Sequence, residues 1–109
     1  MKEVRAIIRP NRRERLREAL RAIPNFPGVS MFSAQGFTAP ASVDKRSVRD
    51  ELTDFTEKFM VCVLCPDDMV ETIRETIIKS CSTGQIGDGL VWVLDVATVH
   101  RIRNSEPMA

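Results

Sequence analysis

The residues best suited to chemistry lie in a glycine-rich segment, Thr83-Gly84-Gln85-Ile86-Gly87-Asp88-Gly89. Its glycines allow tight turns and a close approach of the backbone to a ligand. Because few side chains stand in the way, the amide N–H groups of such a segment can point at an anion. The segment therefore indicates a phosphate site, with an ordinary hairpin-type loop as the alternative.

Two arginines, Arg101 and Arg103, follow at a spacing of two residues. If that segment is extended, both side chains leave the same face of the chain. Guanidinium groups bind phosphate oxygens through paired hydrogen bonds. An amide-lined loop and an arginine pair in one short chain together suggest phosphate binding, whereas the alternative is two solvated arginines.

The cysteines are weaker candidates. Cys62 and Cys65 form a CxxC string, but they lie in an apolar stretch that is typical of a buried strand. Positions i and i+3 of a strand face opposite sides, so the two thiols should not meet on one metal. We interpret both as structural cysteines. His100, the single histidine, has no partner nearby in the sequence and is a weak ligand or base.

Composition narrows the class of protein. A length of 109 residues predicts a single domain, residues 1–109. The balance of 16 basic and 15 acidic residues argues against nucleic-acid binding. The absence of a long apolar run argues against a membrane span, and the start of the chain lacks the apolar core of a signal peptide. We therefore expect a cytoplasmic location, and three cysteines do not suggest a disulfide framework.

The hydrophobic pattern predicts the order βαββαβ. Apolar and β-branched residues favour strands at Glu3–Ile8, Val29–Phe37, Phe59–Cys65 and Leu90–Val96. The first helix is predicted to begin at a capping box of Asn11 and Glu14 and to stop at Pro24. The second is predicted to begin at a capping box of Asp68 and Glu71 and to end near Thr83-Gly84.

This order predicts an α+β, ferredoxin-like fold with an antiparallel sheet and both helices on one face. The other face should carry Ala6, Ile8, Val61 and Val63, or the residues that alternate with them, and we expect it to drive self-association. A polar stretch at about 38–57 predicts a long mobile loop, and residues 104–109 predict a short mobile tail.

Taken together, the sequence resembles the PII signal-transduction family. One matching stretch is Ala6-Ile7-Ile8-Arg9-Pro10, with Leu16-Arg17-Glu18-Ala19-Leu20 after it. The other is the glycine-rich segment, continuing through Val93 to Arg101-Ile102-Arg103. The second stretch is specific, because it agrees with the family's C-terminal signature in residue type and in spacing.

The resemblance implies a homotrimeric regulator of nitrogen metabolism, not an enzyme, with an ATP, ADP or AMP site in each cleft between subunits. It also implies that loop 38–57 docks onto a target enzyme or membrane transporter, with no insertion into the membrane. The positions carried over as nucleotide-binding or loop-base residues are Ile7, Ser30, Gly36, Lys58, Leu64, Gly87, Asp88, Gly89, Arg101 and Arg103.

Departures from the family pattern modify these expectations. Thr38-Ala39-Pro40 stands where family members that sense 2-oxoglutarate carry Gly-Arg-Gln, so no 2-oxoglutarate site of the usual kind is expected and the family's Mg²⁺-holding glutamine has no counterpart. Leu90 replaces a lysine that contacts the distal phosphates, which should weaken ATP more than ADP or AMP. The chain has no tyrosine, so uridylylation of a loop tyrosine is impossible.

Two other classes of protein stay open. A metal-responsive trimer resembling the divalent-cation tolerance proteins is suggested by Cys62, Cys65, Cys81 and His100, since thiolate and imidazole bind Zn²⁺ or Cu⁺. A slow nucleotide hydrolase would need a base near the phosphates, and Asp88 is the one obvious acid there. Our preferred interpretation of Asp88 is a residue that shapes the turn.

Overall fold

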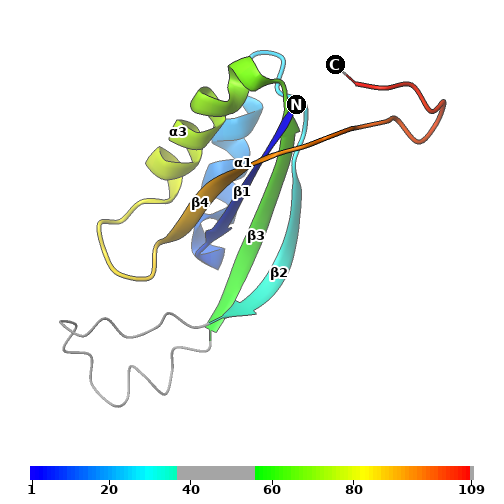
Figure 1. Ribbon diagram of the computed structural model, residues 1–109. Coiled ribbons are helices and arrows are strands. Elements are labelled where there is room, and N and C mark those ends of the chain that lie inside the picture. Colours follow the sequence, from blue (N-terminus) through cyan, green and yellow to red (C-terminus); the bar gives the residue numbers. More distant parts are fainter. Residues whose placement is uncertain (37–55, 109) are drawn as a thin grey trace.

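The computed structural model describes residues 1–36 and 56–108, and these form one sheet with two helices against it (Figure 1). In chain order the elements are β1 (Lys2–Ile8), η1 (Pro10–Arg12), α1 (Arg13–Arg21), β2 (Ser30–Gly36), β3 (Thr56–Cys65), η2 (Asp67–Met69), α3 (Val70–Cys81) and β4 (Gly89–Asp95). The predicted βαββαβ order and the ferredoxin-like fold are confirmed. Among the described helices, none has the length and apolar character needed to cross a membrane.

The sheet has the strand order β2-β3-β1-β4, and every neighbouring pair is antiparallel. The two central strands are β1 and β3, so the chain's first strand lies between elements from its middle and its end. Ile7 of β1 is paired with Met60 of β3 on one side and with Leu90 of β4 on the other. This register places the segment before β4 beside the end of β1.

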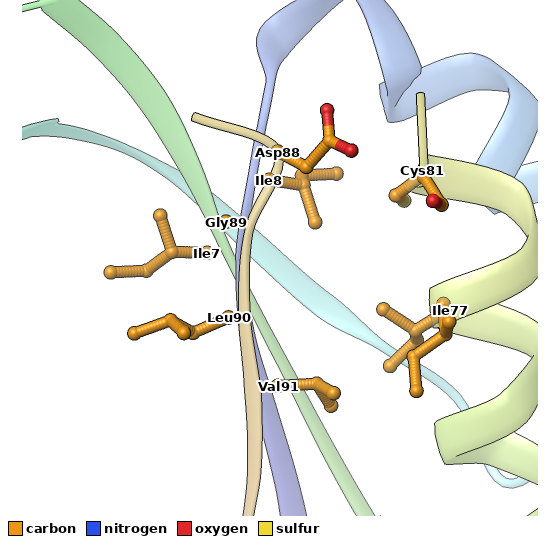
Figure 2. Close-up of a pocket in the computed structure, with 10 residues that line it drawn as sticks. Ile7, Ile8, Ile77, Cys81, Asp88, Gly89, Leu90 and Val91 are labelled. Atoms are coloured by element: carbon orange, nitrogen blue, oxygen red, sulfur yellow. The ribbon is translucent and has the colours of Figure 1, made fainter. Parts of the chain in front are cut away.

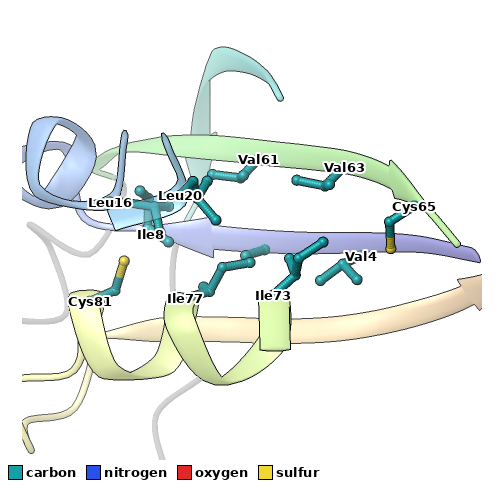
Figure 3. Packing of buried hydrophobic residues seen from close by; sticks show 11 residues of the cluster. Val4, Ile8, Leu16, Leu20, Val61, Val63, Cys65, Ile73, Ile77 and Cys81 are labelled. Atoms are coloured by element: carbon teal, nitrogen blue, oxygen red, sulfur yellow. The ribbon is translucent and has the colours of Figure 1, made fainter. Parts of the chain in front are cut away.

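The core lies between the sheet and the helices (Figure 3). Every second residue of the two central strands points into it, and α1 and α3 cover those residues. Its buried members are Val4, Ala6, Ile8, Leu16, Leu20, Val61, Val63, Cys65, Ile73, Ile77 and Cys81. Ala6, Ile8, Val61 and Val63, our first choice for the uncovered face, are therefore core residues, and that prediction was wrong. Both sets of alternating residues are apolar in these strands, so the pattern alone could not decide which set faces the helices.

The uncovered face carries the alternate residues, and we call it the outer face. Phe32, Met60, Ile7 and Leu90 are paired in one row across all four strands. Phe32 is 52% exposed and Leu90 is 71% exposed. Ile7 and Met60 between them are half-buried, so the row is an apolar strip whose two ends are exposed, a surface of the kind that protein–protein contacts use.

Neither helix begins with the predicted capping box. Each is entered through a short 3-10 turn, and neither α1 nor α3 has a side-chain hydrogen bond at its N-cap. The backbone N–H of Arg12 donates instead to the carbonyl of Arg9, and that of Met69 donates to the carbonyl of Pro66. The 3-10 turns satisfy these backbone groups within the main chain, so the pairs Asn11–Glu14 and Asp68–Glu71 are not needed as caps.

The segments outside the core differ from the predictions in two places. The predicted loop 38–57 overlaps β3, which already begins at Thr56, and the remainder of that loop lies outside the described residues. The C-terminal tail folds back on itself, because the N–H of Arg101 donates to the carbonyl of Glu106 and that of Met108 to the carbonyl of Val99. Arg101 and Arg103 therefore belong to a hydrogen-bonded turn, not to an extended segment.

Candidate anion site at the glycine loop

The glycine-rich segment forms the connection from α3 to β4, which we call the glycine loop (residues 82–88), at the sheet end where β1 finishes. Gly89 closes it with a φ of 110°, which favours glycine. A Cβ at Gly89 would lie 1.8 Å from the carbonyl oxygen of Ile7. A side chain at this position would therefore prevent β4 from pairing with β1.

Asp88 organises the glycine loop from inside. Its carboxylate accepts hydrogen bonds from the backbone N–H of Thr83 at 2.7 Å and of Gly84 at 3.0 Å, and from the hydroxyl of Thr83. These bonds, those from Thr83 foremost, hold the pKa of Asp88 well below its usual range. The interpretation of Asp88 as a residue that shapes the loop is confirmed by these contacts.

Two cations from other segments of the chain, one just after β1 and one in β3, hold the outside of the glycine loop. Arg9 donates through Nη2 to the carbonyl of Ile86 at 2.9 Å and through Nε to Asp88 Oδ1 at 3.2 Å. Lys58, near the start of β3, donates to the carbonyl of Gly87 at 3.4 Å. Arg9 was not among the predicted site residues. The sequence feature that could have indicated Arg9 is its position between a buried strand and Pro10, where the backbone of Arg9 is fixed.

These contacts set the direction of the loop's peptide groups. In a trans peptide the C=O and the next N–H point in opposite directions. With the carbonyls of Ile86 and Gly87 directed at Arg9 and Lys58, the N–H groups of Gly87 and Asp88 point away from those cations. No described residue accepts a hydrogen bond from either N–H. Adjacent free N–H groups of this kind can bind an anion such as a phosphate.

A pocket of about 170 Å³ opens beside the glycine loop, between β4 and α3 (Figure 2). Ile8, Val91, Ile77 and Cys81 point into the space between the sheet and the helix. Ile7 and Leu90 point to the other side of the sheet, onto the outer face. The pocket is mostly apolar, so it does not add polar groups to the anion site.

All but one of the predicted site residues fall into two groups at opposite ends of the sheet. The first group, which we call the loop end, contains Ile7, Gly36, Lys58 and Gly87–Gly89. Gly36 pairs with Thr56 just before Lys58, so the entry to β3 belongs to the same end. Among the described residues, no atom lies within 4 Å of the position that a Cβ at Gly36 would take.

The second group, the terminal end, contains Leu64, Arg101 and Arg103. Leu64 pairs with Glu3 near the start of β1, whereas Ser30 pairs with Cys62 opposite Arg5, in the middle of β1, and belongs to neither end. Arg101 lies beyond the end of β4, where it lines a groove with Met1 and Pro66. Figure 1 shows the chain leaving the sheet after β4 at the end where the N-terminus also lies.

About 20 Å separate the two ends, since β4 runs from Gly89 to Asp95 at roughly 3.3 Å per residue. Arg101 and Arg103 are exposed, and no described carboxylate forms an ion pair with them. Ile102 between them is 101% exposed. One chain therefore does not bring the arginines to the glycine loop.

The thiols do not converge. Cys65 is buried in the core, whereas Cys62 pairs with Arg5 on the outer face, as predicted for positions three apart in a strand. Burial raises the pKa of Cys81 to about 11, so this thiol stays protonated at neutral pH. Among residues 1–36 and 56–108, no group of three or more Cys, His, Asp or Glu side chains is arranged to hold a metal ion.

Comparison with known proteins decides the family. The sequence profile described as nitrogen regulatory protein P-II matches residues 1–106. The chain belongs to the P-II family. Among its relatives, nitrogen regulatory protein P-II 1 of Escherichia coli (strain K12) is 36% identical over 107 residues, covering 97% of this chain and 95% of the relative. Nitrogen regulatory protein P-II of Pyropia yezoensis is 34% identical over the same shares.

Membership of the P-II family makes the chain a PII-like signal-transduction regulator. P-II proteins are regulators rather than enzymes and are typically trimeric. The resemblance seen in the sequence is thereby confirmed, and it extends over nearly the whole chain.

Proposed function

We propose that this chain is a homotrimeric regulator that binds an adenine nucleotide in clefts between copies and controls a partner protein through residues 38–57. The observation that carries the proposal is the separation of the two ends. A glycine loop whose N–H groups at Gly87 and Asp88 have no acceptor among the described residues and a pair of exposed arginines are both suited to phosphate, but they lie beyond opposite ends of β4, a strand about 20 Å long. Two copies are needed to bring them together.

The loop end fits the phosphate part of a nucleotide. The N–H groups of Gly87 and Asp88 supply donors, and Gly89 brings the backbone of β4 close to β1 without a side chain in between. Arg101 and Arg103 of a second copy would supply positive charge from the opposite side. The bound nucleotide changes the partner's activity only if it binds one conformation of the regulator better than another.

The outer face supports the assembly. The row of Phe32, Met60, Ile7 and Leu90 is apolar, its outer members Phe32 and Leu90 are exposed and its central members are half-buried in a single chain, and burial of the row against other copies would provide the driving force for association. Ile7 and Leu90 belong to this row and also lie beside the glycine loop. Assembly and completion of the nucleotide site are therefore expected to be linked.

We further propose that ADP or AMP is preferred to ATP, because Leu90 offers no charge to a distal phosphate. Mg²⁺ would bind only together with the phosphates of the nucleotide.

We also propose that the chain is not a hydrolase, since Asp88, an acid of the loop itself, accepts hydrogen bonds from Thr83, Gly84 and Arg9. No product release from bound nucleotide over several hours is the corresponding expectation. The separated thiols give no support to a metal-responsive function.

The test is a titration of the purified protein with AMP, ADP and ATP, followed by complementation between two variants. Arg101→Ala with Arg103→Ala removes the arginines, and Asp88→Ala releases the glycine loop. Each variant alone should bind about 100-fold more weakly than the wild type, since several charge-assisted hydrogen bonds are lost. Sedimentation should show that both variants remain assembled.

Co-expression of the two variants separates the alternatives. In a mixed assembly, an intact glycine loop of one subunit can face intact arginines of its neighbour, so one class of cleft regains wild-type affinity. A site contained in a single chain would not be restored by mixing. No binding of any adenine nucleotide to the wild type would refute the proposed function itself.

A further inference from the structure

We infer that Arg9 is a positioning residue for the anion site, because it holds the glycine loop in the conformation that turns its N–H groups outward. The inference rests on the proposed function for the identity of the ligand, but its structural part concerns the loop alone. Arg9 is not among the residues carried over from the family resemblance.

The backbone of Arg9 is fixed on both sides. Ile8 before it is a core residue of β1, and Pro10 after it begins η1. The carbonyl of Arg9 also accepts a hydrogen bond from the N–H of Arg12 at 3.0 Å. A side chain that starts from such a fixed point can hold a neighbouring loop more precisely than one that starts from a loop.

The guanidinium of Arg9 makes two contacts in different directions, which a single ammonium group could not make with the same geometry. Nη2 reaches the carbonyl of Ile86, and Nε reaches the carboxylate of Asp88. The planar group offers donors in several fixed directions, whereas a lysine ammonium is a single charge on a flexible stem. Arg9 thus joins the two residues that flank Gly87.

Gly87 lies directly against this guanidinium. A Cβ at Gly87 would be 3.2 Å from Arg9 Nη2, and the φ of Gly87 is 95°. The absence of a side chain at Gly87 therefore allows Arg9 to approach the loop. The peptide between Ile86 and Gly87 is then fixed with its carbonyl toward Arg9 and its N–H toward the ligand side.

The variants that test this role are Arg9→Lys, which keeps the charge, and Arg9→Gln, which removes it. Arg17→Gln is the matched control, because Arg17 is exposed on α1 and pairs only with Glu14 among the described residues. The readouts are amide hydrogen exchange at residues 83–88 of the assembled protein and the affinity for inorganic pyrophosphate and ADP.

In both Arg9 variants we expect exchange at Thr83 and Gly84 to accelerate, since Asp88 loses one of its anchors. We expect affinity for pyrophosphate and ADP to fall about tenfold even in Arg9→Lys, the factor for one charge-assisted hydrogen bond. Arg17→Gln should change neither measurement.

Two results would overturn the inference: wild-type exchange at the loop in Arg9→Gln, or full recovery of affinity in Arg9→Lys. The second would mean that Arg9 contributes charge alone. If the wild type binds neither ligand, the proposed function fails, whereas the exchange measurement still decides whether Arg9 positions the loop.

Discussion

The two ends of the sheet differ in how firmly contacts within one chain hold their candidate phosphate-binding residues. At the loop end, Arg9 and Lys58 hold the glycine loop through hydrogen bonds from distant segments, and Asp88 holds it through hydrogen bonds within the loop. At the terminal end, Arg101 and Arg103 lie on an exposed turn with the fully exposed Ile102 between them. The loop end is already organised to receive an anion, whereas the terminal end presents two positive charges that have no anionic partner among the described residues.

This difference suggests how a short chain builds a regulated site. The organised half needs no partner to keep its shape, because its contacts are internal. In the proposed function, the arginines of the exposed half bind the ligand only when another copy provides the glycine loop. Ligand binding would then be coupled to the arrangement of the subunits, which is the property that a regulator requires.

The largest effect on the loop end is expected from Gly89→Ala. The new Cβ would lie 1.8 Å from the carbonyl oxygen of Ile7 at a φ of 110°, so β4 must move away from β1. We expect a loss of about 3 kcal/mol or more in the free energy of unfolding, or no folding at all. Urea unfolding followed by circular dichroism measures this loss.

Gly36→Ala is the control, because no atom of the described residues lies within 4 Å of its Cβ position and its φ is not in the left-handed region. Its stability should stay within about 0.5 kcal/mol of the wild type. An equal loss in the two variants would show that the close approach of β4 to β1 is not what limits the loop end.

The outer face is tested by Ile7→Asp, which places a carboxylate in the middle of the apolar row. If copies cover this face, the charge becomes buried without a partner, and the dissociation constant of the assembly should rise by about 100-fold or more. Sedimentation velocity across a dilution series measures it. Ile78→Asp on α3, a side chain 48% exposed away from this face, should leave the assembly unchanged.

Leu90→Lys adds a cation to the loop end and tests the proposed preference for ADP or AMP over ATP. If Leu90 is the reason for a preference against ATP, the lysine should increase the affinity for ATP by about tenfold and that for ADP by less. Titration calorimetry with both nucleotides measures the ratio. Leu90→Gln has a polar side chain without the charge and should not shift the ratio. A shift of equal size in the glutamine variant would assign the effect to polarity or shape.

The smallest effect is expected for Asp88 and is visible only in acid. Hydrogen bonds from Thr83 hold its pKa below the ordinary value of 3.8, so the folded state favours the ionised carboxylate. Its contribution to stability is present above about pH 4 and is lost as the pH falls through the lowered pKa. Asp88→Asn should therefore be less stable than the wild type at neutral pH, and the difference should shrink below pH 4. Urea midpoints between pH 2 and pH 7 measure it, and a difference independent of pH would contradict this assignment.

Much of the fold could be predicted because the pattern of each segment is local. The 3.6-residue spacing of Leu16 and Leu20, and that of Ile73 and Ile77, predicted the helices that cover the sheet. The capping boxes were wrong although both helices begin within two residues of the predicted caps, because side-chain caps and backbone 3-10 turns satisfy the same N–H groups, and the sequence motif does not say which of them operates.

Only part of the candidate site could be predicted from local sequence patterns. The glycines of the loop and the two arginines stood out by type and spacing, whereas Arg9 did not, since its partners are 77 and 79 residues away in the sequence. The conditional prediction that Arg101 and Arg103 share a face assumed an extended segment. The turn between Arg101 and Glu106 removes that condition.

The order of elements, the glycine loop and the family resemblance follow from the sequence alone, because local spacing and specific motifs lie in contiguous residues. Which face of the sheet becomes core depends on how the elements pack, since two apolar faces give the same alternation and the docking of α1 and α3 selects one. The tertiary structure also placed Arg9 and Lys58 against the glycine loop and separated the arginines from it by the length of β4. Both results depend on strand pairing between distant segments, which local spacing does not encode.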